Sequence, residues 1–195
     1  PNSVHGPYSQ SWVDEWHRTQ VSEHSYYCSD FKFRKGMVSD KNTPVYTLYM
    51  ADGMWLNKSF KNSILQRIAK CELDGKRYVY SDLGFVLLQQ VVEKVTELPM
   101  DLYLAREFYA PMGLQRTMFL PLTKFTKAEI MPTASNDFLR RQDICGYVHD
   151  ETAACMGGVS GNAGLFSTAE EVAKVYQMLL NGGEFNGKRF LSEAT

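Results

Sequence analysis

Apolar positions recur at helical spacing in four segments of the chain, all after residue 56. An amphipathic helix presents an apolar residue every three or four positions along one face. This spacing predicts helices over residues 57–72, 83–97, 100–109 and 168–181. The expected core faces are Phe60, Ile64, Leu65 and Ile68 in the first helix, Leu88, Val91, Val92 and Val95 in the second, and Ala169, Val172, Val175, Tyr176 and Leu179 in the last.

Residues typical of helix ends stand where these apolar patterns begin and stop. Pro99 ends the second helix and suits the first turn of the third. Ser167 and Glu170 have the spacing of a capping box at the start of the last helix. The pair Gly182-Gly183 ends that helix, because glycine readily adopts the left-handed conformation of a helix C-cap.

The remaining segments predict turns and short extended pieces. Residues 1–56 show no sustained period, so we expect an irregular connecting region there. "GGVSGNAGLF" is typical of a glycine-rich turn, "ICGYVHDE" begins like a strand, and "EFNGKRF" places an Asn-Gly turn between two short arms. No alternation of strands and helices is visible, which argues against a doubly wound sheet. The expected fold class is mainly α with a few short strands (α+β).

Composition narrows the classes of function. The hydrophobic fraction of 44% and the aromatic fraction of 13% are those of a folded globular protein. A net charge of −1 provides no basic field for nucleic acid or anionic lipid. No apolar run is long enough to span a bilayer, and no signal peptide is visible. The chain starts at Pro1 rather than at methionine, so we expect it to be part of a longer protein.

The cysteines and histidines do not predict a metal site, and we expect no cofactor. No C-x-x-C pair or zinc spacing is present, so the four cysteines are interpreted as buried or partly buried thiols: Cys28, Cys71, Cys145 and Cys155. His149, Asp150 and Glu151 are consecutive and would point in alternating directions on an extended chain. The other histidines lie in the irregular region and are expected to be solvated or locally hydrogen-bonded: His5, His17 and His24.

Two serines have settings that partly match those of nucleophiles. Ser160 is not in a nucleophile elbow, because Asn162 stands where the second glycine of G-x-S-x-G is required. The glycines around it do not form a phosphate loop, since G-K-[ST] is missing. Ser29 and Lys32 formally give S-x-x-K, but "CSDFKFRKG" does not have the pattern of a buried helix.

The segment Tyr80-Ser81-Asp82, directly before the second helix, allows two interpretations. In the structural one, Ser81 or Asp82 caps the helix by accepting a backbone N–H, and Tyr80 packs its ring. In the functional one, these three residues belong to a catalytic site. The local pattern favours the helix cap.

A resemblance adds to this interpretation. "YVYSDLGFVLLQQVVEKVTELPMDLYLAREFYAPMGLQRTMF" and "GYVHDETAACMGGVSGNAGLFSTAEEVAKVYQMLLNGG" resemble, in order, two blocks of the serine β-lactamase-like family. That family includes class C β-lactamases, D-alanyl-D-alanine peptidases and esterases, and the likeness covers about residues 45–195. "MADGMWLNKSFKNSILQRI" further resembles members from Bacteroidetes that are fused behind a family 3 β-N-acetylglucosaminidase.

The resemblance implies roles for the three residues. Tyr80 matches a tyrosine that shares proton transfer with the lysine of an S-x-x-K helix. Asp82 matches an Asn/Asp position that orients this lysine or contacts substrate, and Ser81 is the serine between them. In the family the S-x-x-K segment would precede Pro1, and a K-T-G or H-T-G triad would follow the last residue. Residues 57–195 are therefore expected to be the helical lobe of a β-lactamase/transpeptidase-like fold, incomplete at both ends.

The expected function is acyl transfer on a β-lactam, a D-amino-acid peptide or an ester, carried out by the longer protein that contains this chain. The chain itself is expected to be inactive, because it offers no serine with an adjacent base. The alternative is a non-catalytic binding or scaffold module derived from the same fold. Expected partners are a small-molecule or peptidoglycan-derived substrate and the missing lobe. The resemblance implies a periplasmic or secreted location.

Overall fold

The computed structural model describes residues 17–22, 25–29, 33–71 and 80–195, with side chains described from residue 33 onward. Its helices are α1 (Ser59–Ile68), α2 (Asp82–Thr96), α3 (Met100–Leu104), α4 (Glu151–Cys155) and α5 (Ala169–Leu180). A π-helical turn, η3 (Ala105–Tyr109), continues α3, and 3₁₀ turns form η4 (Pro121–Thr123) and η5 (Lys127–Glu129). The four helices predicted from apolar spacing are thus present. Among the described residues, no helix has both the length and the apolar character to cross a membrane.

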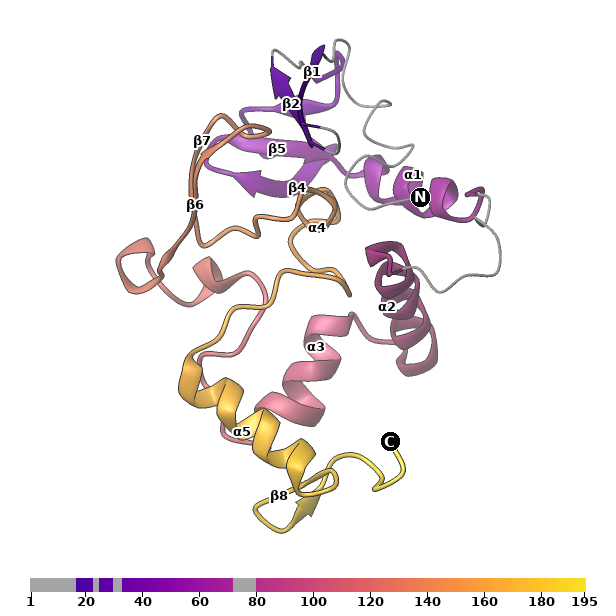
Figure 1. Ribbon diagram of the computed structural model, residues 1–195, viewed down its shortest axis with the longest axis vertical. Coiled ribbons are helices and arrows are strands. Elements are labelled where there is room, and N and C mark those ends of the chain that lie inside the picture. Colours follow the sequence, from indigo (N-terminus) through magenta and orange to yellow (C-terminus); the bar gives the residue numbers. More distant parts are fainter. Residues whose placement is uncertain (1–16, 23–24, 30–32, 72–79) are drawn as a thin grey trace.

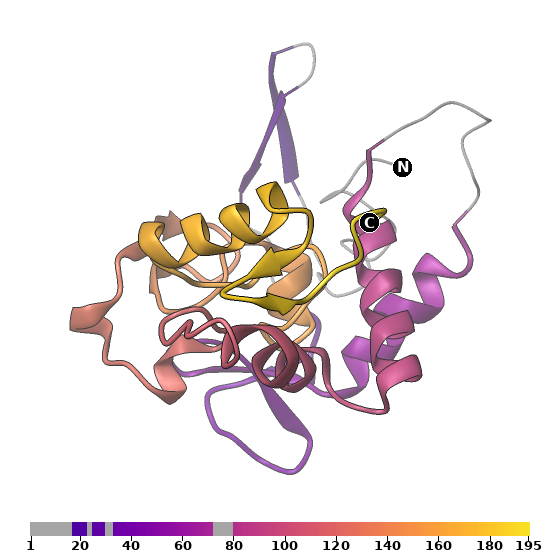
Figure 2. The same ribbon diagram turned by 90° about the horizontal axis from the view of Figure 1, so that it is seen from below.

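Short antiparallel strands accompany the helices, so the arrangement is α+β (Figure 1). Three pairs of strands form hairpins: β1 (His17–Ser22) with β2 (Ser25–Ser29), β6 (Pro132–Asp137) with β7 (Gln142–Cys145), and β8 (Glu184–Phe185) with β9 (Lys188–Arg189). A three-stranded sheet has the order β3 (Val38–Ser39), β5 (Met54–Asn57) and β4 (Tyr46–Ala51). The β1–β2 hairpin projects from the remainder of the molecule (Figure 2).

The prediction that the chain is irregular up to residue 56 is wrong for the part of that region that the structure describes. β1 to β5 lie there, and residues 1–16 are outside the described residues. Strand β4 was not predicted because its burial does not alternate: it ends in two consecutive buried residues, Met50 and Ala51. The division of the chain into a connecting region and a helical lobe stays a prediction.

Two expectations about the later extended segments are confirmed. Strand β7 covers the start of the segment predicted to be strand-like. Asn186 and Gly187 both have positive φ, 49° and 75°, between β8 and β9. That conformation is the one that a two-residue hairpin loop with the Asn-Gly sequence favours.

The main core lies between the β3–β5–β4 sheet, α1, α4 and the start of α2. Helix α1 buries Phe60, Ile64 and Ile68, as its spacing predicts, and Leu65 packs at the edge. A second, smaller cluster joins α5 to the turn after η3 and to the β8–β9 hairpin through Met112, Leu114 and Met178. Cys155 is buried in the main core, and Cys71 and Cys145 are partly buried; all three are free thiols, as expected, whereas the side chain of Cys28 is outside the described residues.

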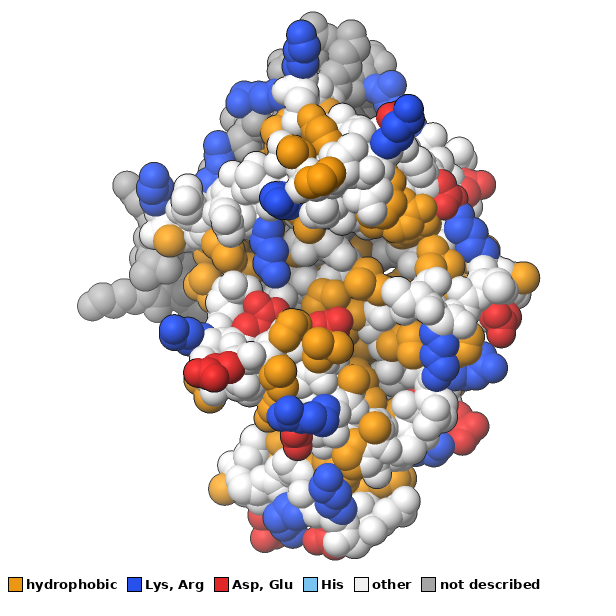
Figure 3. All heavy atoms as spheres, turned by 180° about the vertical axis from the view of Figure 1, so that it is seen from behind, with side chains coloured by type: hydrophobic (Ala, Val, Ile, Leu, Met, Phe, Trp, Pro, Cys, Tyr) orange, Lys and Arg blue, Asp and Glu red, His pale blue; other side chains and the backbone are white. Residues whose placement is uncertain are grey.

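The predicted core face of α2 is wrong. Its buried positions are Leu83, Val86 and Gln89. The stripe expected to be buried is largely exposed: Leu88 is 57%, Val91 55% and Val95 77% exposed. Apolar spacing located the helix, but the face that points inward is the one that meets the 159–161 loop. Exposed hydrophobic side chains are thus a feature of the surface of this protein, and Figure 3 shows a group of them in the middle of one face.

The predicted core face and cap of α5 are also wrong. The helix buries Glu171 and Met178, while Val172, Tyr176 and Leu179 are exposed and Val175 is partly buried. Its N-cap is Thr168, whose hydroxyl accepts from the Glu171 amide, so the expected box of Ser167 and Glu170 does not form. The carboxylate of Glu171 instead points into the protein, where it accepts hydrogen bonds from residues 115–117.

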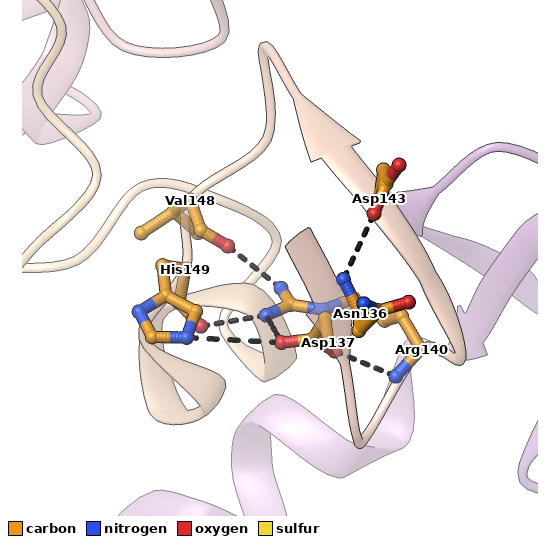
Figure 4. Close-up of polar contacts among 6 residues, drawn as sticks. All are labelled: Asn136, Asp137, Arg140, Asp143, Val148 and His149. Carbon is orange, nitrogen blue, oxygen red and sulfur yellow. Dashed lines mark hydrogen bonds and ion pairs between the residues drawn. The ribbon is translucent and has the colours of Figure 1, made fainter. Parts of the chain in front are cut away.

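A buried ion pair fixes the turn between β6 and β7 (Figure 4). Arg140 donates from Nε and Nη2 to the carboxylate of Asp137, at 2.9 and 2.8 Å, and both side chains are excluded from solvent. The guanidinium also donates to the carbonyls of Val148 and His149, each at 2.6 Å. The turn is thereby tied to the segment that leads into α4. Removing one partner of such a pair is costly, because it leaves the other charge buried without compensation.

Candidate functional site

The N-terminus of α2 has the cap that the sequence predicts. Ser81 is the N-cap residue, in extended conformation, and its Oγ accepts from the Leu83 amide at 3.3 Å. Asp82 is the first residue of the helix. A carboxylate in the first turn is stabilised by the partial positive charge of the helix N-terminus. Ser81 and Asp82 therefore have a structural role whatever else they do.

Tyr80 lies just outside this cap and is exposed. Its side chain is 64% accessible, and its ring centroid is 6.0 Å from that of Phe85 in the first turn of α2. The phenolic hydroxyl donates a hydrogen bond of 3.0 Å to Oδ1 of Asp82. The three residues are thus brought together as a unit, with the phenol displayed at a surface.

The glycine-rich segment 157–164 packs against the same end of α2. Gln89 is 1% exposed; its Nε2 donates to the Val159 carbonyl at 3.3 Å, and its Oε1 accepts from the Gly161 amide at 3.2 Å. A Cβ at Gly161 would lie 2.0 Å from the carbonyl oxygen of Phe85. Only glycine allows this approach, so the loop is held against the turns of α2 that follow Tyr80. The prediction of a turn here is confirmed.

A chain of polar side chains extends from this loop to α4. Asp150 is the N-cap of α4, and its Oδ1 accepts from the Ala153 amide at 2.7 Å and from Nδ2 of Asn162 at 3.0 Å. Oδ1 of Asn162 in turn accepts from the hydroxyl of Ser160 at 2.7 Å. Ser160 is 2% exposed and donates to an amide rather than to a base, which is the setting of a structural hydroxyl.

The link between Asp150 and Asn162 was not predicted. The two residues are twelve positions apart, and no local pattern joins them. The structure places Asn162 in the loop that is held against α2 by Gln89.

The other candidates lie in separate environments. The Nε2 atom of His149 is 3.9 Å from a carboxylate oxygen of Asp137, and the ring is exposed. Glu151, in the first turn of α4, is largely enclosed, and burial raises the pKa of its carboxyl. Ser29 ends strand β2 opposite His17, and Lys32 is outside the described residues, as are His5 and His24. The described part of S-x-x-K is therefore a strand end rather than a helix.

Comparison with known proteins places this geometry in context. A family model described as "Beta-lactamase" matches residues 20–195. A "Putative D-alanyl-D-alanine carboxypeptidase" of Salmonella agona (strain SL483) is 35% identical over 150 residues, which are 69% of this chain and 35% of that protein. A protein of the same description from Salmonella schwarzengrund (strain CVM19633) is 36% identical over 150 residues, with the same coverage. The chain thus matches a segment that spans 35% of the length of these curated relatives.

Among solved structures, the crystal structure of a D-amino acid amidase from Ochrobactrum anthropi SV3, complexed with D-phenylalanine, is similar with a TM-score of 0.45 and 16% sequence identity. The similarity covers 80% of this chain and 45% of that one.

Proposed function

Since the chain belongs to the beta-lactamase family, we propose that it contributes Tyr80 as the proton-transfer residue of a serine acyl hydrolase. The proposed substrate is a peptide that ends in D-alanyl-D-alanine, and an ester or a β-lactam has the same reacting carbonyl. The curated relatives described as carboxypeptidases support this choice of substrate. The activity would belong to the longer protein that carries this chain.

One observation carries the proposal: the phenol of Tyr80 is exposed at the N-terminus of α2 and is held by Asp82. A tyrosine hydroxyl that is oriented by a hydrogen bond and open to solvent can reach a substrate. Position comes first for a general acid or base, and its protonation state second.

The proposed reaction has two steps. A serine outside this chain attacks the carbonyl carbon of the substrate, and its proton passes to the deprotonated oxygen of Tyr80 as the C–O bond forms. The C–N bond to the terminal D-alanine then breaks, and the proton goes from Tyr80 to the leaving amine. A water molecule then attacks the resulting ester and gives a proton to Tyr80. Tyr80 passes this proton to the serine oxygen as the ester bond breaks. The phenol needs a neighbouring cation for the first transfer, because an unperturbed tyrosine has a pKa near 10.

Asp82 has two opposing effects in this scheme. Its hydrogen bond orients the Tyr80 hydroxyl, which lowers the entropic cost of reaching the reactive geometry. Its negative charge favours a protonated lysine nearby but disfavours the tyrosine anion. We propose that the rest of the protein supplies the lysine of an S-x-x-K helix. In the full-length protein its ammonium group shares the Asp82 carboxylate with the Tyr80 hydroxyl. Ser81 keeps its role as the helix cap throughout.

A second candidate function is a non-catalytic binding or scaffold module. The observation that favours it is that Ser160, the nucleophile candidate whose side chain the structure describes, bonds to an amide. Under this alternative, Tyr80 and Asp82 are surface residues with a local hydrogen bond. Whether the full-length protein hydrolyses a D-alanyl-D-alanine peptide distinguishes the two functions.

The wider setting is also a proposal. The resemblance supports a longer protein in which a family 3 β-N-acetylglucosaminidase from a Bacteroidetes-type bacterium precedes this segment. A peptidoglycan-derived substrate would then reach both domains in the periplasm or outside the cell. Release of both N-acetylglucosamine and D-alanine from peptidoglycan fragments by one purified protein would support this setting, and a protein without glycosidase activity would contradict it.

The test uses the full-length protein and the variant Tyr80→Phe, which keeps the ring and loses the hydroxyl. Release of D-alanine from a D-alanyl-D-alanine peptide should fall about 10² to 10⁴-fold, the usual effect of removing a positioned acid or base. The melting temperature should stay unchanged. Tyr176→Phe is the matched control, because Tyr176 is 63% exposed, much like Tyr80, and lies on α5. It should keep wild-type turnover.

Two results would decide against the catalytic role. A Tyr80→Phe protein with at least half of the wild-type kcat/KM would make the tyrosine structural. A wild-type protein that neither turns over the peptide nor forms a covalent adduct with a fluorescent penicillin would favour the scaffold module. The 195-residue chain by itself should form no such adduct, and an adduct mapped to Ser29 or Ser160 would contradict that expectation.

A further inference from the structure

Phe85 contacts both Tyr80 and the glycine-rich segment 157–164. Its ring centroid lies 6.0 Å from that of Tyr80, with the two ring planes 47° apart. This separation is within the range of about 4.5–7 Å in which aromatic rings attract each other. The backbone carbonyl oxygen of Phe85 is the atom that a Cβ at Gly161 would approach to 2.0 Å. One residue of α2 therefore links the exposed tyrosine to the loop.

Tyr80 and Phe85 stand at the two positions of a hydrophobic staple. Ser81 is the N-cap of α2, so Tyr80 directly precedes the cap and Phe85 is the fourth residue of the helix. In a hydrophobic staple these two positions pack against each other and fix the angle at which the chain enters the helix. In this protein, the residue before the cap is also the proposed proton-transfer residue.

Asp82 and Phe85 hold different parts of the Tyr80 side chain. Asp82 accepts a hydrogen bond of 3.0 Å from the hydroxyl, and Phe85 packs against the ring. A hydrogen bond fixes one atom, and a second contact along the ring reduces the number of rotamers open to the side chain. Phe85 is a rigid support, because the next residue, Val86, is completely buried and the Gly161 loop lies against the Phe85 carbonyl.

Two simpler explanations of Phe85 exist. Phe85 is 41% exposed, and Leu88, Val91 and Val95 are exposed on the same helix, so an apolar residue at this position also extends the stripe of α2. A staple also stabilises the start of a helix by itself. Both explanations predict that removing the ring of Phe85 changes stability and leaves the chemistry of the folded protein as it was.

We propose that Phe85 is a positioning residue for Tyr80, which keeps the phenol in the orientation that proton transfer requires. This inference rests on the proposed function of Tyr80. Proton transfer needs a distance of about 2.6–3.2 Å between donor and acceptor atoms, so a small displacement of the phenol lowers the rate strongly. Phe85 acts through the Tyr80 hydroxyl, and its removal should therefore lower kcat and leave KM nearly unchanged.

The kinetic experiment uses the full-length protein and a D-alanyl-D-alanine peptide. Phe85→Ala should lower kcat at least about fivefold, with KM within about twofold of the wild type. Phe85→Tyr keeps the ring and should restore kcat. Phe138→Ala is the matched control, because Phe138 is 45% exposed and lies in the turn between β6 and β7; it should keep the wild-type kcat. In a Tyr80→Phe protein, Phe85→Ala should cause no further loss, because the hydroxyl that it positions is already missing.

A spectroscopic experiment gives an answer that does not depend on turnover. In full-length protein labelled with 3-fluorotyrosine, the ¹⁹F resonance that disappears in Tyr80→Phe belongs to Tyr80. This resonance should move toward its position in the unfolded protein in Phe85→Ala, because the neighbouring ring is removed, and should stay in place in Phe138→Ala. Phe85→Leu keeps the apolar stripe and lacks the ring, so it should show the same movement even if Phe85→Ala folds poorly.

The outcomes separate this inference from the proposed function. An unmoved Tyr80 resonance in Phe85→Ala and Phe85→Leu would overturn the positioning role, and so would a wild-type kcat in both variants. An equal loss from Phe85→Ala with and without the Tyr80 hydroxyl would also overturn it, because Phe85 would then act by another route. If Tyr80→Phe keeps at least half of the wild-type kcat/KM, the proposed function fails, and a moved resonance then shows that Phe85 holds a structural tyrosine.

Discussion

Gln89 and Gly161 are joined by a hydrogen bond of 3.2 Å, from the Gly161 amide to Oε1 of a glutamine that is almost completely buried in α2. The other end of the same side chain donates to the Val159 carbonyl at 3.3 Å and to Glu93 at 3.0 Å. One glutamine thus satisfies two backbone groups of the loop. Because Tyr80 precedes α2 directly, this contact also sets the loop relative to the candidate site.

Gln89→Leu should destabilise the chain by about 1–3 kcal/mol, because it leaves the Val159 carbonyl and the Gly161 amide without partners in a partly buried position. The midpoint of urea denaturation measures this change. Gln90→Leu is the control, since the neighbouring amide contacts Glu93 only at 3.5 Å. The control should shift the midpoint much less. Equal midpoints for the two variants would show that the buried bonds contribute nothing.

Gly161→Ala should move the loop away from α2. A Cβ there would lie 2.0 Å from the Phe85 carbonyl oxygen, and backbone atoms cannot move aside as a flexible side chain can. A loss of stability of about 1–3 kcal/mol is expected from such overpacking. Gly84→Ala provides the contrast: Gly84 lies within α2 with nothing within 4 Å of its added Cβ. That variant should gain about 0.5–1 kcal/mol from higher helix propensity.

An unchanged melting temperature in Gly161→Ala would mean that the loop can rest elsewhere at no cost. In that case the close approach to Phe85 would not position the loop beside Tyr80.

The helices could be predicted from sequence, but the faces that they bury could not. Leu88 is apolar and exposed, whereas Gln89 is polar and buried, because the partner of Gln89 is a loop 72 residues away in the chain. Glu171 is likewise buried because three donors from residues 115–117 meet its carboxylate. Spacing within a helix reports amphipathicity and carries no information on such distant partners. The cap formed by Ser81 was predictable because it depends on local sequence, whereas the catalytic role of Tyr80 stays a prediction.

The exposed stripe of α2 leads to a test that reverses the sequence-based expectation. On the core face predicted from spacing, Val91→Asp would bury a charge and cost several kcal/mol, but Val91 is 55% exposed. In the 195-residue chain the cost should be within about 0.5 kcal/mol. Val86→Asp, at a fully buried position of the same helix, should cost several kcal/mol, because its carboxylate would have no partner in the core.

Thermal melts of the two variants, side by side, measure this difference. In the full-length protein Val91→Asp should become costly if another part of the polypeptide covers the stripe. Similar losses for Val86→Asp and Val91→Asp in the 195-residue chain would contradict the burial pattern described for α2.

Glu171 predicts a pH dependence of stability. Burial would raise the pKa of its carboxyl, but hydrogen bonds from the Thr117 hydroxyl and from the amides of Arg116 and Gln115 outweigh burial, so the pKa is lowered. A carboxyl with a lowered pKa in the folded state stabilises the fold above its unfolded value, about 4.3 for glutamate. That contribution is lost as the pH falls through the lower, folded value.

Glu171→Gln should therefore be clearly less stable than the wild type at pH 7, by about 1–3 kcal/mol, since the Gln NH₂ group faces donors. The difference should begin to shrink once the pH falls below about 4.3, where the unfolded carboxyl takes up a proton, and should go on shrinking as the pH falls through the lower folded value. Urea denaturation at a series of pH values gives both quantities. Glu170→Gln is the control, because Glu170 is exposed and its ion pair with Lys174, at 3.1 Å, lies on the surface; it should cost at most about 0.5 kcal/mol. A Glu171→Gln deficit that stays constant from pH 7 to pH 3 would mean that packing, rather than the charge of this carboxylate, holds residues 115–117 against α5.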